Sequence, residues 1–238
     1  MQITDYRKLR FNNINTPQFK HLLLLIYWPI YGLTFYFLER GLTLDYTPIE
    51  CSLDAKIPFC EYFIVPYLLW FGYLVGIHLY TLLFDIPAFK KLMYFIMITY
   101  TVTTVVYIVY PNMQLLRVTE FPRDNIFTDI VRNFYEFDTN TNVCPSLHVI
   151  GSFAVLFTSW SCKGFNTLPW RIANIILTCA ISISTVFLKQ HSIIDVFAGL
   201  ILCAAALPLA YILPDIIAKK KAAAQITAEN ETISAAKS

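Results

Sequence analysis

Apolar residues gather in six long runs separated by polar segments. The runs are approximately 22–38, 62–84, 92–110, 147–162, 172–188 and 193–213. About 20 residues of helix cross the hydrocarbon core of a membrane, and polar flanks can extend the three shorter runs. A chain in lipid must satisfy its own backbone hydrogen bonds, which favours helices. The pattern therefore predicts an all-α, polytopic membrane protein with six transmembrane helices.

Composition supports this prediction. Of the 238 residues, 57% are hydrophobic and only 14% are charged, whereas soluble domains carry about 25% charged residues. We expect one membrane domain over residues 1–213, with its core at 60–213, followed by an Ala- and Lys-rich cytoplasmic tail at 214–238. The net charge of +2 and the lack of an arginine-rich run or of interleaved aromatic and basic residues argue against a nucleic-acid partner. No feature indicates an oligomeric state.

The basic residues predict the orientation. Placing both termini in the cytoplasm leaves twelve Lys and Arg residues inside and six outside. Cytoplasmic segments are usually the more basic ones. We therefore expect a multi-pass cell-membrane protein with cytoplasmic N- and C-termini.

The six cysteines show no spacing typical of a metal site, and we expect no metal and no cofactor. Cys51 and Cys60 flank one polar loop. They could form a disulfide if that loop faces an oxidising compartment.

Two histidines stand where apolar runs begin. His148 ends Cys144-Pro145-Ser146-Leu147-His148, and His191 starts His191-Ser192-Ile193-Ile194-Asp195. In a six-helix plan both motifs reach the same membrane face in either orientation, and the charge bias makes that face external. This arrangement favours chemistry on a substrate that lies in the bilayer.

His191 and Asp195 are one helical turn apart, so their side chains share a face. A carboxylate on one imidazole nitrogen fixes the tautomer and leaves the other nitrogen as a nucleophile or base. The alternative is a structural histidine bonded to a membrane aspartate. The two readings stay open at this point.

Pro145, Ser146 and His148 predict a different role. Free N–H groups at a helix start can hold an anion, and the Ser146 hydroxyl adds a donor. A protonated His148 could then give its proton to a leaving oxygen. An ordinary capped helix start is the alternative.

A bound anion also needs cations. Arg117 adjoins the end of an apolar run and Lys189 lies two residues before His191, so we expect both to bind phosphate. For Arg123 and Arg132 a solvated surface position is the better interpretation.

These residues resemble the type-2 phosphatidic acid phosphatase superfamily, also called the lipid phosphate phosphatase and vanadium haloperoxidase superfamily. Its Pro-Ser-x-His motif is matched by Pro145, Ser146 and His148, and its Ser-Arg-x5-His-x3-Asp motif by Ser184, His191 and Asp195. The resemblance covers roughly residues 60–213 and fits the membrane branch. It departs at Thr185, where the family has Arg, and the family's Lys-x6-Arg-Pro motif is missing.

The resemblance implies a phosphohistidine mechanism. His191 would attack phosphorus, Asp195 would orient it, and His148 would protonate the departing alcohol and then activate water. Ser146, Arg117 and Lys189 would bind the phosphoryl oxygens. The substrate implied is a lipid phosphate or polyprenyl diphosphate.

Two other functions stay open. Pro-Ser-Leu-His followed by a basic residue and His-x3-Asp also resembles inositol phosphorylceramide synthases, which pass a phosphoryl headgroup to another alcohol. The missing family cations are consistent instead with a non-catalytic membrane protein that keeps the fold.

Overall fold

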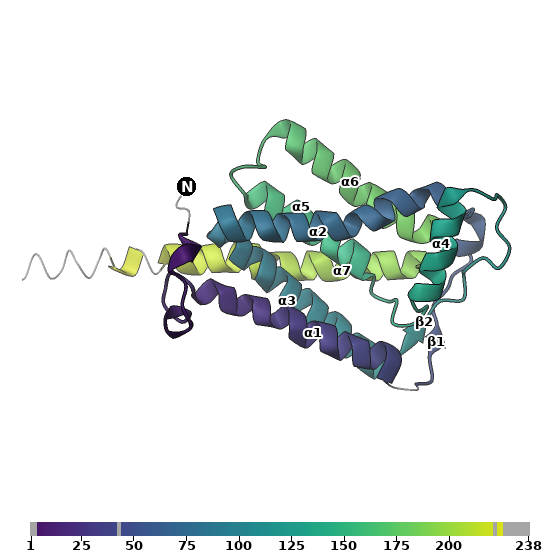
Figure 1. Ribbon diagram of the computed structural model, residues 1–238, viewed down its shortest axis with the longest axis horizontal. Coiled ribbons are helices and arrows are strands. Elements are labelled where there is room, and N and C mark those ends of the chain that lie inside the picture. Colours follow the sequence, from purple (N-terminus) through teal and green to yellow (C-terminus); the bar gives the residue numbers. More distant parts are fainter. Residues whose placement is uncertain (1–3, 42–43, 221–222, 226–238) are drawn as a thin grey trace, which may run out of the picture.

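The computed structural model describes residues 4–41, 44–220 and 223–225. Within these residues the chain forms seven α-helices and two short strands (Figure 1). The helices are α1 (Tyr27–Tyr36), α2 (Ile64–Phe84), α3 (Ile86–Val109), α4 (Ile126–Phe137), α5 (Leu147–Ser161), α6 (Leu168–Phe187) and α7 (Ile193–Leu207). Strand β1 (Thr47–Pro48) pairs in parallel with β2 (Asn112–Met113).

Five helical stretches of the described chain are long and apolar enough to cross a membrane. They are Lys20–Gly41, Glu61–Phe84, Ile86–Val109, Leu168–Phe187 and Ile193–Gln225. The sixth predicted span, α5, is apolar but has only 15 residues. The prediction of an all-α protein is therefore confirmed for the described residues, and five candidate spans with one shorter apolar helix are consistent with a multi-pass membrane protein.

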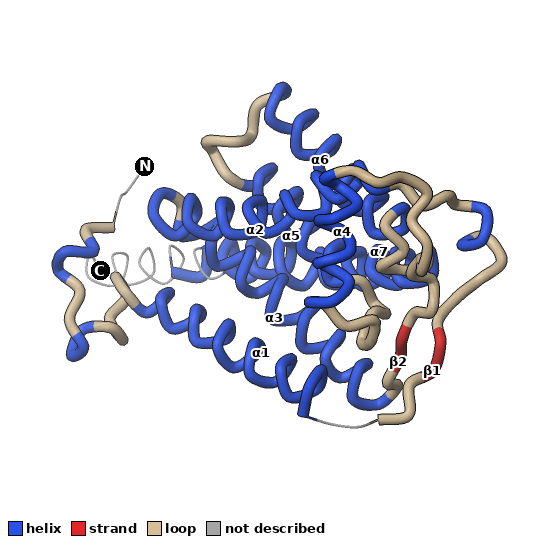
Figure 2. Tube along the Cα trace, turned by 45° about the vertical axis from the view of Figure 1, so that its right-hand side comes forward, coloured by secondary structure: helices blue, strands red, loops and turns tan. Residues whose placement is uncertain are grey.

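The short helix α5 lies at the centre of the bundle. It contacts α2, α3, α6 and α7, whereas α1 packs mainly on α3 (Figure 2). The main apolar core joins α5 to its neighbours α2, α3 and α7, with Ile96, Ile150 and Ala154 among its fully buried members. Large apolar side chains on the outer faces of the helices stay exposed, as expected where a helix meets lipid.

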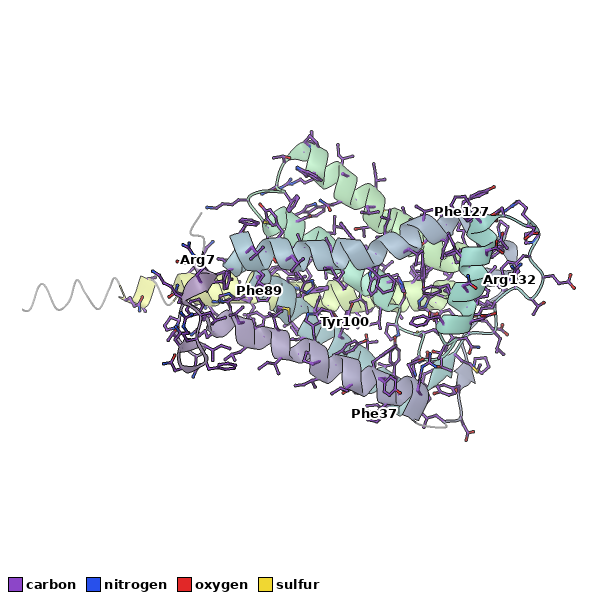
Figure 3. All side chains as sticks on the ribbon, viewed as in Figure 1. Arg7, Phe37, Phe89, Tyr100, Phe127 and Arg132 are labelled. Atoms are coloured by element: carbon purple, nitrogen blue, oxygen red, sulfur yellow. The ribbon has the colours of Figure 1, made fainter. Side chains whose placement is uncertain are left out.

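The two ends of the bundle differ in the structural elements and the charged residues that they carry. The N-terminal segment and the end of the yellow helical stretch lie at one end, and α4, β1 and β2 lie at the other (Figure 1). Arg7 and Arg132 mark these opposite ends (Figure 3). The end with α4 exposes more carboxylates than cations. Its exposed carboxylates are those of Asp45, Glu50, Glu120, Asp124, Asp129 and Glu136, and its exposed cations are those of Arg40, Lys56, Arg123 and Arg132.

Helix α4 lies in the polar segment between the third and fourth apolar runs, where the sequence pattern predicted no helix. Asn125 caps the helix by accepting hydrogen bonds from the N–H groups of Phe127 and Thr128. Val131 is fully buried, and Phe134 meets the ring of Tyr67 edge-on at 5.2 Å. The cap and the apolar spacing of this helix can be found in the sequence. They were overlooked because the segment also carries many charged residues.

Two further expectations concern the ends of the chain and a loop. The predicted tail, 214–238, is helical as far as residue 220, and residues 226–238 lie outside the described part. Cys51 and Cys60 are not bonded to each other in the structure, so the disulfide considered for this loop is not formed.

Candidate functional site

His191 and Asp195 form a buried pair at the start of α7. The Nδ1 atom of His191 is 3.1 Å from Oδ2 of Asp195, which also accepts a hydrogen bond from the Ser192 N–H at 3.0 Å. Asp195 is completely buried. The Ser192 hydroxyl accepts from the Ile194 N–H, which completes a capping box. This geometry fixes the imidazole by Nδ1 and leaves Nε2 for another partner.

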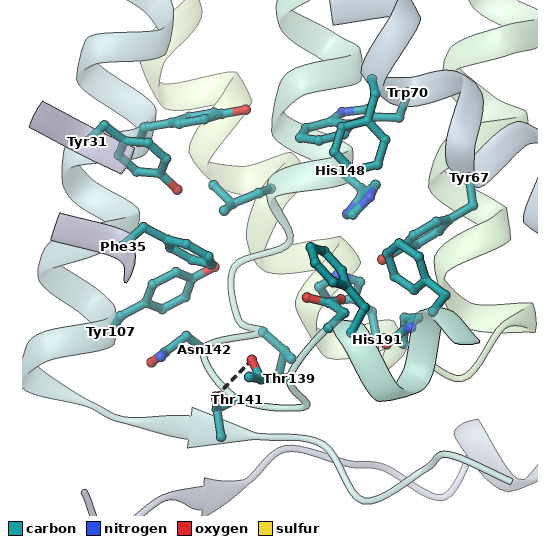
Figure 4. Close-up of a pocket in the computed structure, with 18 of the residues that line it drawn as sticks. Tyr31, Phe35, Tyr67, Trp70, Tyr107, Thr139, Thr141, Asn142, His148 and His191 are labelled. Atoms are coloured by element: carbon teal, nitrogen blue, oxygen red, sulfur yellow. Dashed lines mark hydrogen bonds between the residues drawn. The ribbon is translucent and has the colours of Figure 1, made fainter. Parts of the chain in front are cut away.

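His148 lies in the first turn of α5, next to this pair. The centroids of the His148 and His191 rings are 5.9 Å apart. The His148 ring is held between Tyr67, stacked at 4.1 Å, and Trp70 at 4.4 Å (Figure 4). Its Nε2 atom is buried and has no hydrogen-bond partner among the described residues. The structure therefore brings both histidines together and leaves a ring nitrogen of His148 available.

Ser146 occupies the N-cap position of α5 but does not cap the helix. Its side chain makes no capping hydrogen bond, is fully buried, and has no partner within the described chain. Buried hydroxyls are normally hydrogen-bonded. An unpaired hydroxyl beside the free N–H groups of a helix start is suited to contact an anion, although Ser146 itself is not among the described residues that line the cavity beside the histidines.

A cavity of about 300 Å³ opens beside the two histidines. It is lined by His148 and His191, by polar residues of the segment before α5, and by aromatic side chains from α1, α2, α3 and α4 (Figure 4). No lysine or arginine is among the described residues that line it. The histidines and the polar residues thus form one end of the cavity. The aromatic side chains line the rest of it, which we call the aromatic arm.

Lys189 does not reach this cavity. Its Nζ atom donates to the backbone carbonyls of Asp54, at 2.7 Å, and Ile57, at 2.5 Å. The residue is 8% exposed, and burial lowers the pKa of its amino group, while nearby Asp54 raises it. Its φ of 56° turns the chain sharply between α6 and α7. The role of Lys189 in binding phosphate stays a prediction, and in this conformation its ammonium group instead holds the loop of residues 51–57.

Arg117 is also engaged elsewhere. Its Nη1 atom donates to the carbonyls of Tyr135 and Asp138, both at 2.9 Å. Its Nη2 atom donates to the carbonyl of Thr139 and to Oε1 of Gln190, both at 2.7 Å, and Nε also reaches Gln190. All five guanidinium N–H groups therefore have acceptors. The role of Arg117 in binding phosphate stays a prediction, and in this conformation its guanidinium connects the end of α4 to the segment before His191.

The electrostatics around Arg117 include a second carboxyl. Asp138 lines the cavity, and its Oδ2 atom is 4.0 Å from Nη2 of Arg117. Burial raises the pKa of Asp138, and the attraction of Arg117 opposes that rise. An ionised Asp138 would repel a phosphate bound in the cavity.

The two cations assigned to the surface do lie outside the cavity. Arg123 makes a bidentate ion pair with Glu61 at 2.6 Å, and Arg132 pairs with Asp129 at 2.7 Å. Both arginine side chains are 48% exposed. The Arg123 pair joins the loop before α4 to the start of α2, which is a structural role.

Asp54 is a residue of the site region that sequence reasoning missed. Its carboxylate accepts hydrogen bonds from the Ser192 hydroxyl at 2.7 Å and the Ile193 N–H at 2.9 Å. Burial alone would raise the pKa of Asp54, but these bonds and one from the Cys51 N–H hold it below its ordinary value. No local signal could reveal this contact, because about 140 residues separate the partners.

Gln190, Asn142 and the aromatic pair around His148 were missed as well. Gln190 precedes His191, and its position beside the predicted nucleophile is the only signal that could have marked it. Asn142 lines the cavity, and its Oδ1 atom has no partner within the described chain. Tyr67 and Trp70 lie three residues apart on one face of α2. The sequence does not indicate that this face contacts His148.

Comparison with known families agrees with this geometry. Residues 117–217 match the model of the PAP2 superfamily, so this part of the chain is similar to that superfamily. The match contains Ser146, His148, His191 and Asp195 and ends beyond α7. Comparisons with curated proteins and with solved structures give no match.

Proposed function

We propose that this protein is a membrane phosphatase that hydrolyses a lipid phosphate through a phosphohistidine intermediate. The observation that carries the proposal is the pair of histidines, with ring centroids 5.9 Å apart, at the polar end of a cavity with an aromatic arm. The similarity of residues 117–217 to the PAP2 superfamily supports a phosphatase-like reaction on a phosphate ester.

The first step is attack by Nε2 of His191 on phosphorus. Asp195 holds the opposite nitrogen and stabilises the positive charge that develops on the ring. A nitrogen–phosphorus bond forms and the phosphorus–oxygen bond of the ester breaks. His148 gives its proton to the departing alcohol oxygen.

The second step releases phosphate. His148, now neutral, removes a proton from water, and the resulting hydroxide attacks phosphorus and breaks the nitrogen–phosphorus bond. Ser146 and the N–H groups at the start of α5 contact the phosphoryl oxygens as their charge builds. Arg117 and Lys189 act indirectly in this scheme, by holding Gln190 and the segment before α7.

We further propose that the site faces the outside of the cell membrane and that both termini are cytoplasmic. The excess of basic residues at the opposite end of the bundle supports this orientation. A cysteine-labelling scan with an impermeant thiol reagent tests it. Labelling of a cysteine introduced at exposed Glu120 in intact cells supports the orientation, and labelling only after lysis contradicts it.

The decisive experiment measures phosphate release from lipid phosphates by the purified protein. We expect release from the wild type, none from His191→Ala, and acid-labile phosphate on the wild-type protein after rapid quenching. Release that continues in His191→Ala contradicts the mechanism. Turnover that occurs only when an acceptor alcohol is added would identify a headgroup transferase that uses the same two histidines.

A further inference from the structure

We propose that Tyr31 and Tyr100 form a hydrogen-bonding subsite for a carbonyl group in the lipid part of the substrate. This inference deepens the proposed function and rests on it for the position of the phosphate. It narrows the substrate from any lipid phosphate to one whose chains are joined through an ester or amide.

The two tyrosine hydroxyls are buried and unused. Neither Oη atom has a hydrogen-bond partner among the described residues, and Tyr100 is only 2% exposed. Their rings lie 5.0 Å apart between centroids, and both line the cavity. In Figure 4, Tyr31 points from α1 into the cavity, across from Trp70 and His148. Two buried donors without an acceptor therefore belong to neighbouring rings that line the cavity.

The aromatic arm lies deeper in the bundle than the histidine end. The hydroxyl of Tyr107 donates to the backbone carbonyl of Pro145, at 2.9 Å, which places Tyr107 at the level of the segment before His148. Tyr100 precedes Tyr107 on α3 by two helical turns, a rise of about 10 Å. Figure 3 also shows Tyr100 in the middle of the bundle.

An unpaired hydroxyl is costly at this depth. Burying a hydroxyl without a hydrogen bond is unfavourable, and the hydrocarbon of a membrane offers no acceptor. Nearby tyrosines on the same helices are satisfied, since Tyr107 is bonded to Pro145 and Tyr27 to the Thr101 hydroxyl at 3.0 Å. Among the buried tyrosine hydroxyls of the described residues, those of Tyr31 and Tyr100 have no partner, and both residues line the cavity.

The ligand that fits must carry an acceptor close to its phosphate. A polyprenyl chain has no hydrogen-bonding group, so it would leave both hydroxyls unpaired. A diacylglycerol phosphate has ester carbonyl oxygens a few bonds from phosphorus, and an amide-linked lipid offers the same group. With phosphate at the histidines, such a carbonyl extends into the arm lined by Tyr31 and Tyr100.

The test compares a diacylglycerol phosphate with its dialkyl ether analogue, which has the same chains but no carbonyl. We expect the wild type to favour the ester in kcat/KM by about tenfold, because a site built to bond a polar group discriminates against an analogue that lacks it. Tyr31→Phe and Tyr100→Phe should each lower the ester value about three- to tenfold and leave the ether value unchanged.

Tyr27→Phe is the matched control, because it removes a hydroxyl that is bonded outside the cavity. It should keep the wild-type preference for the ester. Equal turnover of ester and ether by the wild type overturns the proposal, since it means that the hydroxyls are satisfied by water. An ester preference that survives in the Tyr31→Phe, Tyr100→Phe double variant overturns it as well.

A binding measurement separates this inference from the proposed reaction. Trp28 and Trp70 line the same cavity, so their fluorescence reports on occupancy. In His191→Ala protein, the ester lipid should bind more tightly than the ether, and the double Phe variant should lose that difference. If the wild type releases no phosphate but this difference is found, the phosphatase function fails and the subsite stands. If the ester and ether lipids bind equally well, the proposed subsite is wrong, whether or not the protein releases phosphate.

Discussion

The backbone N–H of Ser146 donates to the backbone carbonyl of Asp195, with nitrogen and oxygen 3.1 Å apart. This main-chain bond joins the start of α5 to the first turn of α7. Gly199 permits the approach, because a Cβ atom there would lie 3.3 Å from the Ser146 carbonyl oxygen. The segments that carry the two histidines are therefore positioned by backbone contacts, independently of the side chains proposed to react.

Ser146 and Ser192 both occupy helix N-cap positions, yet only one of them caps, so their alanine variants should differ. We expect Ser146→Ala to lower phosphate release about tenfold with unchanged thermal stability, because its hydroxyl has no partner within the described residues. Ser192→Ala should destabilise the protein by about 1 kcal/mol, through loss of a cap. Thermal unfolding in detergent measures both. A clear loss of stability in Ser146→Ala would contradict this division.

Gly151 leaves space for the aromatic ring that supports His148. A Cβ atom at Gly151 would lie 2.7 Å from Nε1 of Trp70, which is too close without movement of the indole. We expect Gly151→Ala to displace Trp70 from the His148 ring and lower kcat at least about tenfold, equivalent to roughly 1.4 kcal/mol. Gly76→Ala is the control, because a Cβ atom there meets nothing within 4 Å. Equal activity in both variants would show that Trp70 does not position His148.

Lys189→Met tests whether this lysine binds phosphate or holds a loop. Loss of two hydrogen bonds to backbone carbonyls should lower the free energy of unfolding by about 1–3 kcal/mol. Inhibition by inorganic phosphate should stay unchanged, since Lys189 does not line the cavity. Lys56→Met, at an exposed position, is the control. If phosphate inhibition of Lys189→Met weakens tenfold without loss of stability, Lys189 binds phosphate.

Arg117→Lys should be poorly tolerated although it keeps the charge. A lysine has three donors and no planar fork, so it cannot replace the five N–H groups that Arg117 uses. We expect a loss of about 1–3 kcal/mol in unfolding free energy, together with lower activity. Arg132→Lys, which alters an exposed pair with Asp129, should change neither. An active, stable Arg117→Lys protein would show that the guanidinium is not needed to connect α4 to the segment before His191.

Asp54 predicts a pH dependence of stability. Its pKa in the folded state lies below the ordinary value, so the stabilisation is present above that value, about 3.9, and is lost as the pH falls through the folded pKa. The unfolding midpoint of the wild type should therefore fall more steeply with acidification than that of Asp54→Asn. Parallel curves for the two proteins in this acidic range would mean that Asp54 adds no such stabilisation.

The fold and part of the site could be predicted from the sequence because their signals are local. Apolar runs marked the membrane helices, and the spacing from His191 to Asp195 predicted a contact within one turn. The contacts of Asp54, Lys189 and Arg117 could not be predicted, since each depends on segments distant in the sequence. For Lys189 and Arg117, proximity to a motif in sequence suggested proximity to phosphate, whereas their N–H groups donate to backbone carbonyls and, for Arg117, also to the Gln190 side chain.

The carboxylates exposed around α4 have a consequence for how substrate arrives. A surface with more acidic than basic groups repels soluble anions and slows their capture from bulk water. A lipid held in the bilayer avoids this barrier, because it reaches the cavity by diffusion in two dimensions. Added salt should therefore speed the reaction of a water-soluble phosphate ester while changing that of a lipid phosphate much less.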